Sequence, residues 1–424
     1  MKVLVITRNA WDDSNSIGNT FSNFFEGFDD VEFANIYFRS ARPNNKICKN
    51  YYHVTETEIL KKWFFPKQIG KQFVYNGETV SKKQFPVENK EKVLVNFVRG
   101  KNIKLAYRLS NYIWYQKKWI NSNLKSFVES FSPDIAITFA KSAPQYFLTV
   151  KYLRENFNIP LFTWIADDEY TGLLKTKSKK EIENLRYILT ESATVCGCSE
   201  EMCKYYNSVF GCKAFPLYKG CEIKERKKES CCNLLKMVYA GNLLYGRVDV
   251  IKTIAEALDN ISDSKTQVSF EIYSNTQLSS SQLDAFNKIK CLKYMGQKDY
   301  ETIKECMSMA DVVIHAESFE EDQIIKTKYS FSTKIIDCLQ SGSVLLAVGP
   351  CGISSIDYVR KIPGACVITD ISRVQQDLEA FVNDRDSFRS RAEQIHDFAK
   401  KYHDRERNAA MIKKAFRNIM ERRV

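Results

Sequence analysis

The sequence has no long hydrophobic run. No stretch of its 424 residues approaches the roughly 18 consecutive apolar residues that a membrane-spanning helix needs. The beginning, MKVLVITRNAW, has one Lys and a short apolar run, without the longer apolar core and small-residue cleavage site of a signal peptide. Tandem repeats and low-complexity segments are also lacking. We therefore expect a globular protein that stays in the cytoplasm.

Several signatures of catalysis and metal binding are missing as well. The chain has no Walker A sequence, no nucleophile elbow and no Ser-His-Asp pattern, and YSFSTKII has no Gly-rich phosphate cradle. A kinase or ATPase is therefore excluded. The 13 cysteines contain no CxxC…CxxC pairing, which argues against a zinc site. We expect reduced thiols, no metal site and no cofactor.

Acidic residues are fewer than basic residues. The chain has 63 Lys and Arg against 51 Asp and Glu, a formal net charge of +12. Such a balance favours an anionic partner: nucleic acid, an acidic membrane face or a phosphorylated substrate. Most of the excess falls in residues 51–125, where ILKKWFFPK and NYIWYQKKW mix cations with aromatics.

Basic amphipathic helices with Trp and Phe commonly lie on membrane surfaces. Residues 51–125 therefore predict contact with an anionic membrane, which would make the protein peripheral at the inner face of the cell membrane. The alternative is a solvated basic face with buried aromatics. The aromatic residues that carry this prediction are Trp63, Phe64, Phe65, Tyr112, Trp114, Tyr115 and Trp119.

Short apolar strands alternate with amphipathic stretches, and the pattern restarts after residue 215. Near-continuous apolar strands separated by helices indicate parallel sheets covered on both faces. The sequence thus predicts an α/β fold with two doubly wound Rossmann-like domains facing each other across a cleft. The expected strands are 2–7, 134–140, 160–166 and 193–199 in the first series, and 236–240, 267–274, 311–316, 343–349 and 365–370 in the second.

The strongest site signal is YSFSTKIIDCLQSG, residues 329–342. Ser332 is a good N-cap, so Thr333 and Lys334 would begin a helix. The start of a helix suits a phosphate, and Asp337, one turn on from Thr333, would then lie near a ribose. The alternative is a plain amphipathic helix with an N-cap.

The second signal is YAGNLLYGR, residues 239–247. A strand runs into Gly241 and Asn242, and glycines after a strand let the backbone approach a diphosphate. Arg247 would hold phosphate with two hydrogen bonds. The alternative is an ordinary strand-to-helix turn with an exposed Arg.

Three weaker signals follow other strands. Gly18 lies in the polar stretch NAWDDSNSIGNT, where a ligand or only solvent can sit. Asp168, in WIADDEY, is placed as a catalytic base or hydroxyl-binding group, or as a cap of the next helix. His315, in HAE, is placed against a donor sugar, although a lone His at a strand end is more often structural.

Taken together, these motifs resemble bacterial glycosyltransferases of the GT-B fold, and family 4 most closely. The resemblance is best over about residues 236–350. YAGNLLYGR is similar to that family's turn at the donor pyrophosphate, and Lys334, Asp337 and Gly342 keep the spacing of its donor-site helix. Tyr329 stands where the family's first Glu would be, and Asp337 replaces its second Glu.

The resemblance implies an enzyme that moves a sugar from a nucleoside-diphosphate sugar to a glycan or lipid-linked acceptor in bacterial surface polysaccharide synthesis, with retention at the anomeric carbon. By this resemblance Arg247 and Lys334 would neutralise the diphosphate and Asp337 would bind the ribose. Together with the signals described above, the expected donor-binding residues are Gly18, Gly241, Asn242, Arg247, Ser332, Thr333, Lys334 and Asp337, and the expected catalytic residues are Asp168 and His315. The expected domains are an acceptor domain at 1–215, a linker at 216–235, a donor domain at 236–400 and a helix at 401–424 that returns to the first domain.

Two other functions stay open. One is a sugar-nucleotide epimerase or a phosphorylase of the same fold. The other is a non-catalytic basic protein that binds membrane or nucleic acid, since aromatics between lysines can stack on bases. No recognised nucleic-acid module is visible, so nucleic acid is not an expected partner.

Overall fold

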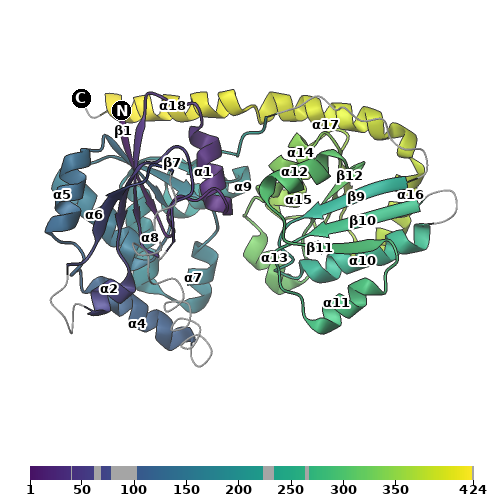
Figure 1. The fold of residues 1–424 in the computed structure, drawn as a ribbon, viewed down its shortest axis with the longest axis horizontal. Coiled ribbons are helices and arrows are strands. Elements are labelled where there is room, and N and C mark those ends of the chain that lie inside the picture. Colours follow the sequence, from purple (N-terminus) through teal and green to yellow (C-terminus); the bar gives the residue numbers. More distant parts are fainter. Residues whose placement is uncertain (40, 62–67, 78–102, 223–233, 263–266, 423–424) are drawn as a thin grey trace. The chain divides into compact units, whose positions relative to one another are not determined.

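The computed structural model describes the chain except for residues 40, 62–67, 78–102, 223–233, 263–266 and 423–424. The described residues form two compact units. Unit 1 comprises Met1–Leu217 and Ala409–Val424, and unit 2 comprises Tyr218–Asn408. Each contains a mainly parallel sheet with helices (Figure 1), so the expected α/β fold of two doubly wound Rossmann-like domains is confirmed. Most of the expected linker, 216–235, lies outside the described residues.

Unit 1 is built on an eight-stranded sheet in its described part, with the strand order β4-β3-β2-β1-β5-β6-β7-β8. All neighbouring strands are parallel except β3 and β4. The strands are β1 Lys2–Thr7, β2 Glu32–Tyr37, β3 Asn50–His53, β4 Lys71–Val74, β5 Ile135–Phe139, β6 Leu161–Ile165, β7 Ser192–Gly197 and β8 Phe215–Pro216.

The helices of unit 1 begin and end where the sequence supplies caps. Asn15 caps the first helix by accepting from Gly18 N–H, and Ser199 caps α9 by accepting from Met202 N–H. Gly211, at φ +68°, ends α9. The helices are α1 Ser16–Phe25, α2 Glu56–Lys61, α4 Ile103–Tyr115, α5 Ser122–Phe131, α6 Pro144–Phe157, α7 Tyr170–Thr176, α8 Lys179–Thr190 and α9 Glu200–Phe210.

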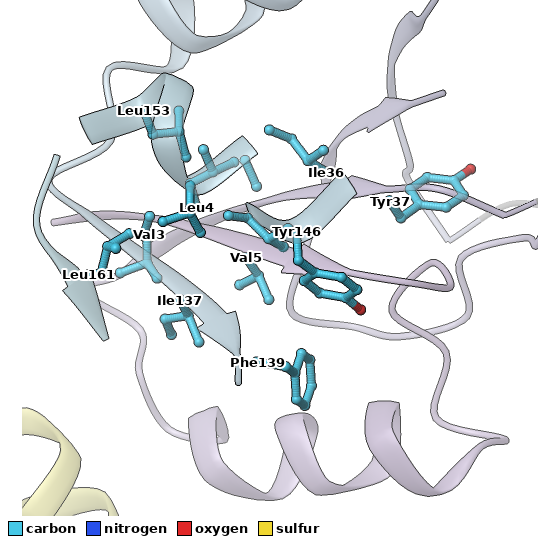
Figure 2. Packing of buried hydrophobic residues seen from close by; sticks show 14 of the residues in the cluster. Val3, Leu4, Val5, Ile36, Tyr37, Ile137, Phe139, Tyr146, Leu153 and Leu161 are labelled. Carbon is cyan, nitrogen blue, oxygen red and sulfur yellow. The ribbon is translucent and has the colours of Figure 1, made fainter. Parts of the chain in front are cut away.

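The core of unit 1 lies around its central strands. Val3, Leu4 and Val5 of β1 are fully buried, and β5 and β6 are buried along their whole length. Figure 2 shows Val5, Ile137 and other side chains of this cluster packed together. Burial on both faces explains why these strands are continuous apolar runs.

Two of the aromatic residues that carry the membrane prediction are part of this core. Trp114 is 1% exposed and Trp119 is fully buried, and their rings lie 5.4 Å apart. The Trp114 indole donates to Glu56 Oε1 at 2.7 Å, and that of Trp119 to the Trp114 carbonyl at 3.1 Å. For these two residues the structure shows buried aromatics rather than a membrane-facing surface. Trp63, Phe64 and Phe65 lie outside the described residues.

Unit 2 is built on a six-stranded parallel sheet in its described part, with the order β11-β10-β9-β12-β13-β14. The strands are β9 Leu234–Ala240, β10 Gln267–Tyr273, β11 Leu292–Gly296, β12 Val312–Ala316, β13 Val344–Val348 and β14 Cys366–Ile368. The helices are α10 Arg247–Ile261, α11 Ser280–Asn287, α12 Tyr300–Ser308, α13 Glu321–Thr327, α14 Lys334–Gln340, α15 Ser354–Val359, α16 Val374–Asn383 and α17 Phe388–Tyr402, with 3-10 turns at Ile371–Arg373 and Arg385–Ser387.

The last helix, α18 (Arg405–Glu421), begins in unit 2 and continues into unit 1. Its Phe416 ring lies 6.3 Å from the Phe25 ring and 5.7 Å from the Phe162 ring. This end of the helix therefore packs into the core of unit 1. Within the described ranges, no helix combines the length and apolar character that crossing a membrane requires.

Candidate functional site

Unit 2 has a topological switch point between β9 and β12. From β9 the chain continues to β10 and β11 on one side, then returns to β12 on the other side of β9. Open α/β sheets bind ligands outside the carboxyl ends of the strands at such a point. Five residues near these strand ends form what we call the switch-point site: Gly241, Asn242, Arg247, Glu317 and Lys334.

The turn after β9 brings its backbone close to the segment after β12. Gly246 has φ +71° and precedes α10. A Cβ atom there would lie 2.4 Å from Ser318 Oγ, so both the backbone conformation and the close approach require glycine. Asn242 Oδ1 accepts from Leu244 N–H at 3.3 Å, which helps to fix the turn.

Arg247 is buried at the start of α10 and forms an ion pair with Glu317. Its Nη2 lies 3.0 and 2.9 Å from the two carboxylate oxygens of Glu317. Its Nε donates to the Ala316 carbonyl at 3.1 Å, and its Nη1 to Asn242 Oδ1 at 2.9 Å. We expected this guanidinium to bind phosphate. Most of its N–H donors are instead hydrogen-bonded to groups of the protein. The alternative of an exposed Arg is wrong, since the residue is buried.

His315 lies beside the same carboxylate. Its Nε2 is 3.3 Å from Glu317 Oε1, and the residue is 4% exposed. Burial lowers the pKa of His315, although Glu317 opposes this, so the imidazole is neutral at pH 7. Burial raises the pKa of Glu317, but His315 and Arg247 more than offset it, and the pKa lies below its usual value. The structure thus places His315 against Glu317, as part of a buried polar cluster.

Lys334 is a cation that has no ion-pair partner among the described residues. It is half-buried, and burial, followed by the charge of Arg247, lowers its pKa to about 8. Its Nζ has no hydrogen bond or ion pair with any residue in the described ranges. A Cβ on Gly241 would lie 2.4 Å from this Nζ. The ammonium therefore lies against the end of β9.

The helix that carries Lys334 begins one residue later than expected. Thr333 rather than Ser332 takes the cap position, with φ −59° and ψ −18°, and its side chain makes no capping hydrogen bond. The Ser332 N–H instead donates to Ser355 Oγ at 2.9 Å. The helix ends at Gln340, and Gly342 follows at φ +73°, as a helix C-terminus favours.

Asp337, expected at the ribose, is anchored within unit 2. Its Oδ1 accepts from Lys219 Nζ at 2.7 Å and from the Tyr300 hydroxyl at 3.2 Å. Lys219 is 6% exposed, and its ammonium also lies 5.4 Å from the centre of the Tyr300 ring. Lys219 therefore compensates the carboxylate charge and fixes its orientation.

The remaining two predicted residues belong to unit 1. Gly18 packs against the backbone of Asp12, since a Cβ would lie 2.0 Å from the Asp12 carbonyl oxygen, so the fold itself requires glycine there. Asp168 Oδ1 accepts from Thr171 N–H in α7 at 3.3 Å and from the Tyr206 hydroxyl at 3.2 Å. It thus serves the start of the next helix, the alternative weighed for it. Its Oδ2 is buried without a hydrogen-bond partner in the described part of the chain.

Three residues of unit 2 were missed. Glu317 stood within the quoted HAE motif, directly after a strand, but only its His was considered. Lys219 lay in the charged stretch that was taken for a linker, and Tyr300 lies in an amphipathic helix without a motif. For Glu317, a carboxylate after a strand was an available signal. For the other two, only the tertiary structure brings them to Asp337.

Comparison with known proteins identifies the fold. No protein-family model and no curated protein matches the chain. Among solved structures, sucrose-phosphate synthase from Thermosynechococcus elongatus is similar over 99% of both chains, with 10% identity and a TM-score of 0.63. Anabaena HepE, in complex with UDP and glucose, is similar over 98% of both chains, with 10% identity and a TM-score of 0.62.

TarM from S. aureus, in complex with Fondaparinux, alpha-GlcNAc-glycerol and UDP, is similar over 69% of this chain and 57% of its own, with 13% identity and a TM-score of 0.53. At these identities the likeness concerns the fold. The chain therefore has the GT-B fold, two Rossmann-like domains, that these glycosyltransferases share.

Proposed function

We propose that this protein is a glycosyltransferase that moves a sugar from a nucleoside-diphosphate sugar to an acceptor hydroxyl. The observation that carries the proposal is Lys334, a cation left unpaired by the described residues at the switch point of unit 2. A half-buried ammonium of this kind is stabilised by an anion, and a diphosphate is the anion that a GT-B donor supplies.

The chemistry follows from where charge develops. When the glycosidic bond to the diphosphate breaks, negative charge grows on the leaving group, and a positioned cation lowers the barrier. Lys334 takes this role. Arg247 acts through Glu317 and Asn242, because its ion pair ties the segment after β12 to the turn after β9. The proposal does not call for a metal ion, since Lys334 can neutralise the leaving group.

Asp337 completes the donor-binding site. Its Oδ2 accepts from the ribose hydroxyls, while Lys219 and Tyr300 donate to its Oδ1. UDP is the first donor nucleotide to test, because the structures of HepE and TarM contain UDP. Acceptor binding falls to unit 1, where the buried, unpartnered Oδ2 of Asp168 is suited to accept from an acceptor hydroxyl.

The finer parts of the proposal come from the family 4 resemblance. They are a glycan or lipid-linked acceptor, a role in bacterial surface polysaccharide synthesis, and retention at the anomeric carbon. Their support is the spacing of Lys334, Asp337 and Gly342. Peripheral attachment to the membrane is supported by the basic character of residues 51–125, with Trp114 and Trp119 no longer counted.

The direct test is turnover of sugar nucleotides by the full-length protein. UDP-, GDP- and ADP-sugars are supplied with and without cell-envelope glycolipid extract, and release of nucleoside diphosphate is followed. Acceptor-dependent release from one donor class supports the proposal. Isomerised sugar nucleotide formed without an acceptor would replace it with an epimerase, and the absence of any turnover counts against an enzyme of this class.

Replacing Gly241 with alanine should change UDP binding without changing the stability of the fold. The added Cβ meets the flexible end of Lys334, so the side chain can move aside at little cost in folding free energy. The ammonium is then displaced from the end of β9. We expect Gly241→Ala to keep its thermal midpoint within a few degrees and to bind UDP on the order of tenfold more weakly, as measured by calorimetry. Equal affinity in both proteins would remove Lys334 from the site.

A further inference from the structure

The carboxyl edge of the unit 1 sheet carries a second polar cluster. In this sheet β1 lies between β2 and β5, which makes its end the switch point of the unit. Arg8 follows β1 directly, and Arg39 follows β2 after one intervening residue. The Phe38 N–H donates to the Arg8 carbonyl at 3.2 Å, so the two arginines leave adjacent strand ends. Both are exposed at this edge.

Tyr146 of α6 brings its hydroxyl to the same edge. The residue is 4% exposed, and its ring lies 5.8 Å from the Phe38 ring and 6.4 Å from the Phe139 ring. It thus contacts the ends of the strands on either side of β1. Figure 2 shows its hydroxyl directed away from Val5 and Ile137. That hydroxyl has no hydrogen-bond partner among the residues that the structure describes.

The electrostatic surroundings of this hydroxyl link it to both arginines. Burial raises the pKa of Tyr146, whereas the charges of Arg8 and Arg39 lower it and that of Glu169 raises it. The charge of Glu169 is balanced within the protein, because its Oε1 accepts from Ser142 N–H at 3.1 Å and its Oε2 lies 3.7 Å from Lys141 Nζ. The charges of the two arginines thus act on the unpartnered hydroxyl.

We propose that Arg8, Arg39 and Tyr146 bind the phosphate of a phosphorylated acceptor. Two guanidinium forks match phosphate oxygens, and a tyrosine hydroxyl adds a neutral donor. The site lies at a sheet edge of the kind that binds ligands in open α/β folds. The assignment rests on the proposed glycosyl transfer and names the chemical class of its acceptor. The phosphate belongs to a soluble sugar phosphate or to a lipid phosphate.

The experiment measures binding by the full-length protein to two kinds of phosphate. Glucose 6-phosphate is titrated by calorimetry, with glucose as the neutral counterpart. Co-sedimentation is measured with phosphatidylcholine vesicles containing phosphatidic acid, and with phosphatidylcholine vesicles alone. Binding of the sugar phosphate identifies a soluble acceptor class, and binding of the acidic vesicles identifies a lipid phosphate. Either result supports the site if the variants below reduce it.

We expect Arg8→Gln combined with Arg39→Gln to weaken phosphate binding by tenfold or more, about the effect of losing a charged hydrogen bond. Tyr146→Phe should weaken it less and keep the ring packing. The matched control is Arg108→Gln, at an exposed position of α4, which should leave binding unchanged. Should the double glutamine variant fail to fold, Arg8→Lys with Arg39→Lys keeps the charges but loses the forks, and should also bind more weakly.

Stabilisation by UDP is measured on every variant, because it reports unit 2 separately. Unchanged phosphate binding in the double variant, or no binding of either phosphate probe to the parent protein, overturns the acceptor site even if UDP still stabilises the protein. If UDP does not stabilise the parent protein, that result counts against the proposed function itself.

Discussion

Replacement of Glu317 with glutamine is expected to lower the free energy of unfolding of unit 2 by about 3–5 kcal/mol. The Arg247 guanidinium has two hydrogen bonds to this carboxylate, and the exposed fractions of the two side chains are 10% and 2%. Removing the negative charge leaves a cation in a buried site without its partner. Denaturant unfolding, followed by circular dichroism, measures the loss.

Two variants make this result specific. Glu256→Gln breaks an exposed i,i+4 pair with Lys252 and should cost less than about 1 kcal/mol. Replacing both charges, Glu317→Leu with Arg247→Met, should recover much of the stability that Glu317→Gln loses, because no unpaired charge remains. If Glu317→Gln costs no more than Glu256→Gln, the buried ion pair is not what ties the two loops together.

UDP affinity is expected to fall as pH rises through about 8. In the free protein burial sets the pKa of Lys334 to about 8, and the diphosphate favours the protonated amine. Binding is therefore fully supported below this pKa, and above it each pH unit should weaken binding by up to about tenfold, since one proton must be taken up. Calorimetric titration of UDP between pH 6.5 and about 9.5 provides the measurement.

The control for this profile is a cation that does not titrate. Lys334→Arg keeps a positive charge at all these pH values and should flatten the profile, whereas Lys334→Met should lower affinity at pH 7 by roughly 30-fold or more. A wild-type profile that is flat from pH 7 to about 9.5, or a Lys334→Met variant with full affinity, would mean that another group binds the diphosphate.

The strands of both sheets could largely be predicted from the sequence. The expected strand 2–7 is β1, and 236–240 and 311–316 overlap β9 and β12, because strands buried on both faces must be continuous apolar runs. The edge strand β4, Lys71–Val74, was not predicted, since its exposed residues carry no such run. The interior strands β2 and β3 were not predicted either, although both are mostly buried, because EFANIY and NYYH are not continuous aliphatic runs. Local hydrophobicity thus identified the most apolar strands but not every buried one.

The candidate site was predictable only in part. Lys334 and Gly241 were found because a helix start and a strand end are local features of the sequence. The partners of Arg247 and Asp337 were not, because Glu317 is 70 residues and Lys219 is 118 residues away along the chain. The same long-range packing buried Trp114 and Trp119, whose pattern had indicated a membrane surface.

The measurement that tests the central claim most directly is the thermal stability of the full-length protein with UDP, GDP and ADP, each compared with its nucleoside. A ligand that binds only the native state raises the unfolding temperature, by an amount set by its concentration relative to its Kd. We predict that one diphosphate raises it by several degrees, that its nucleoside does not, and that Lys334→Met loses the shift. No shift with any of the three, or an equal shift in Lys334→Met, would contradict a diphosphate site at Lys334.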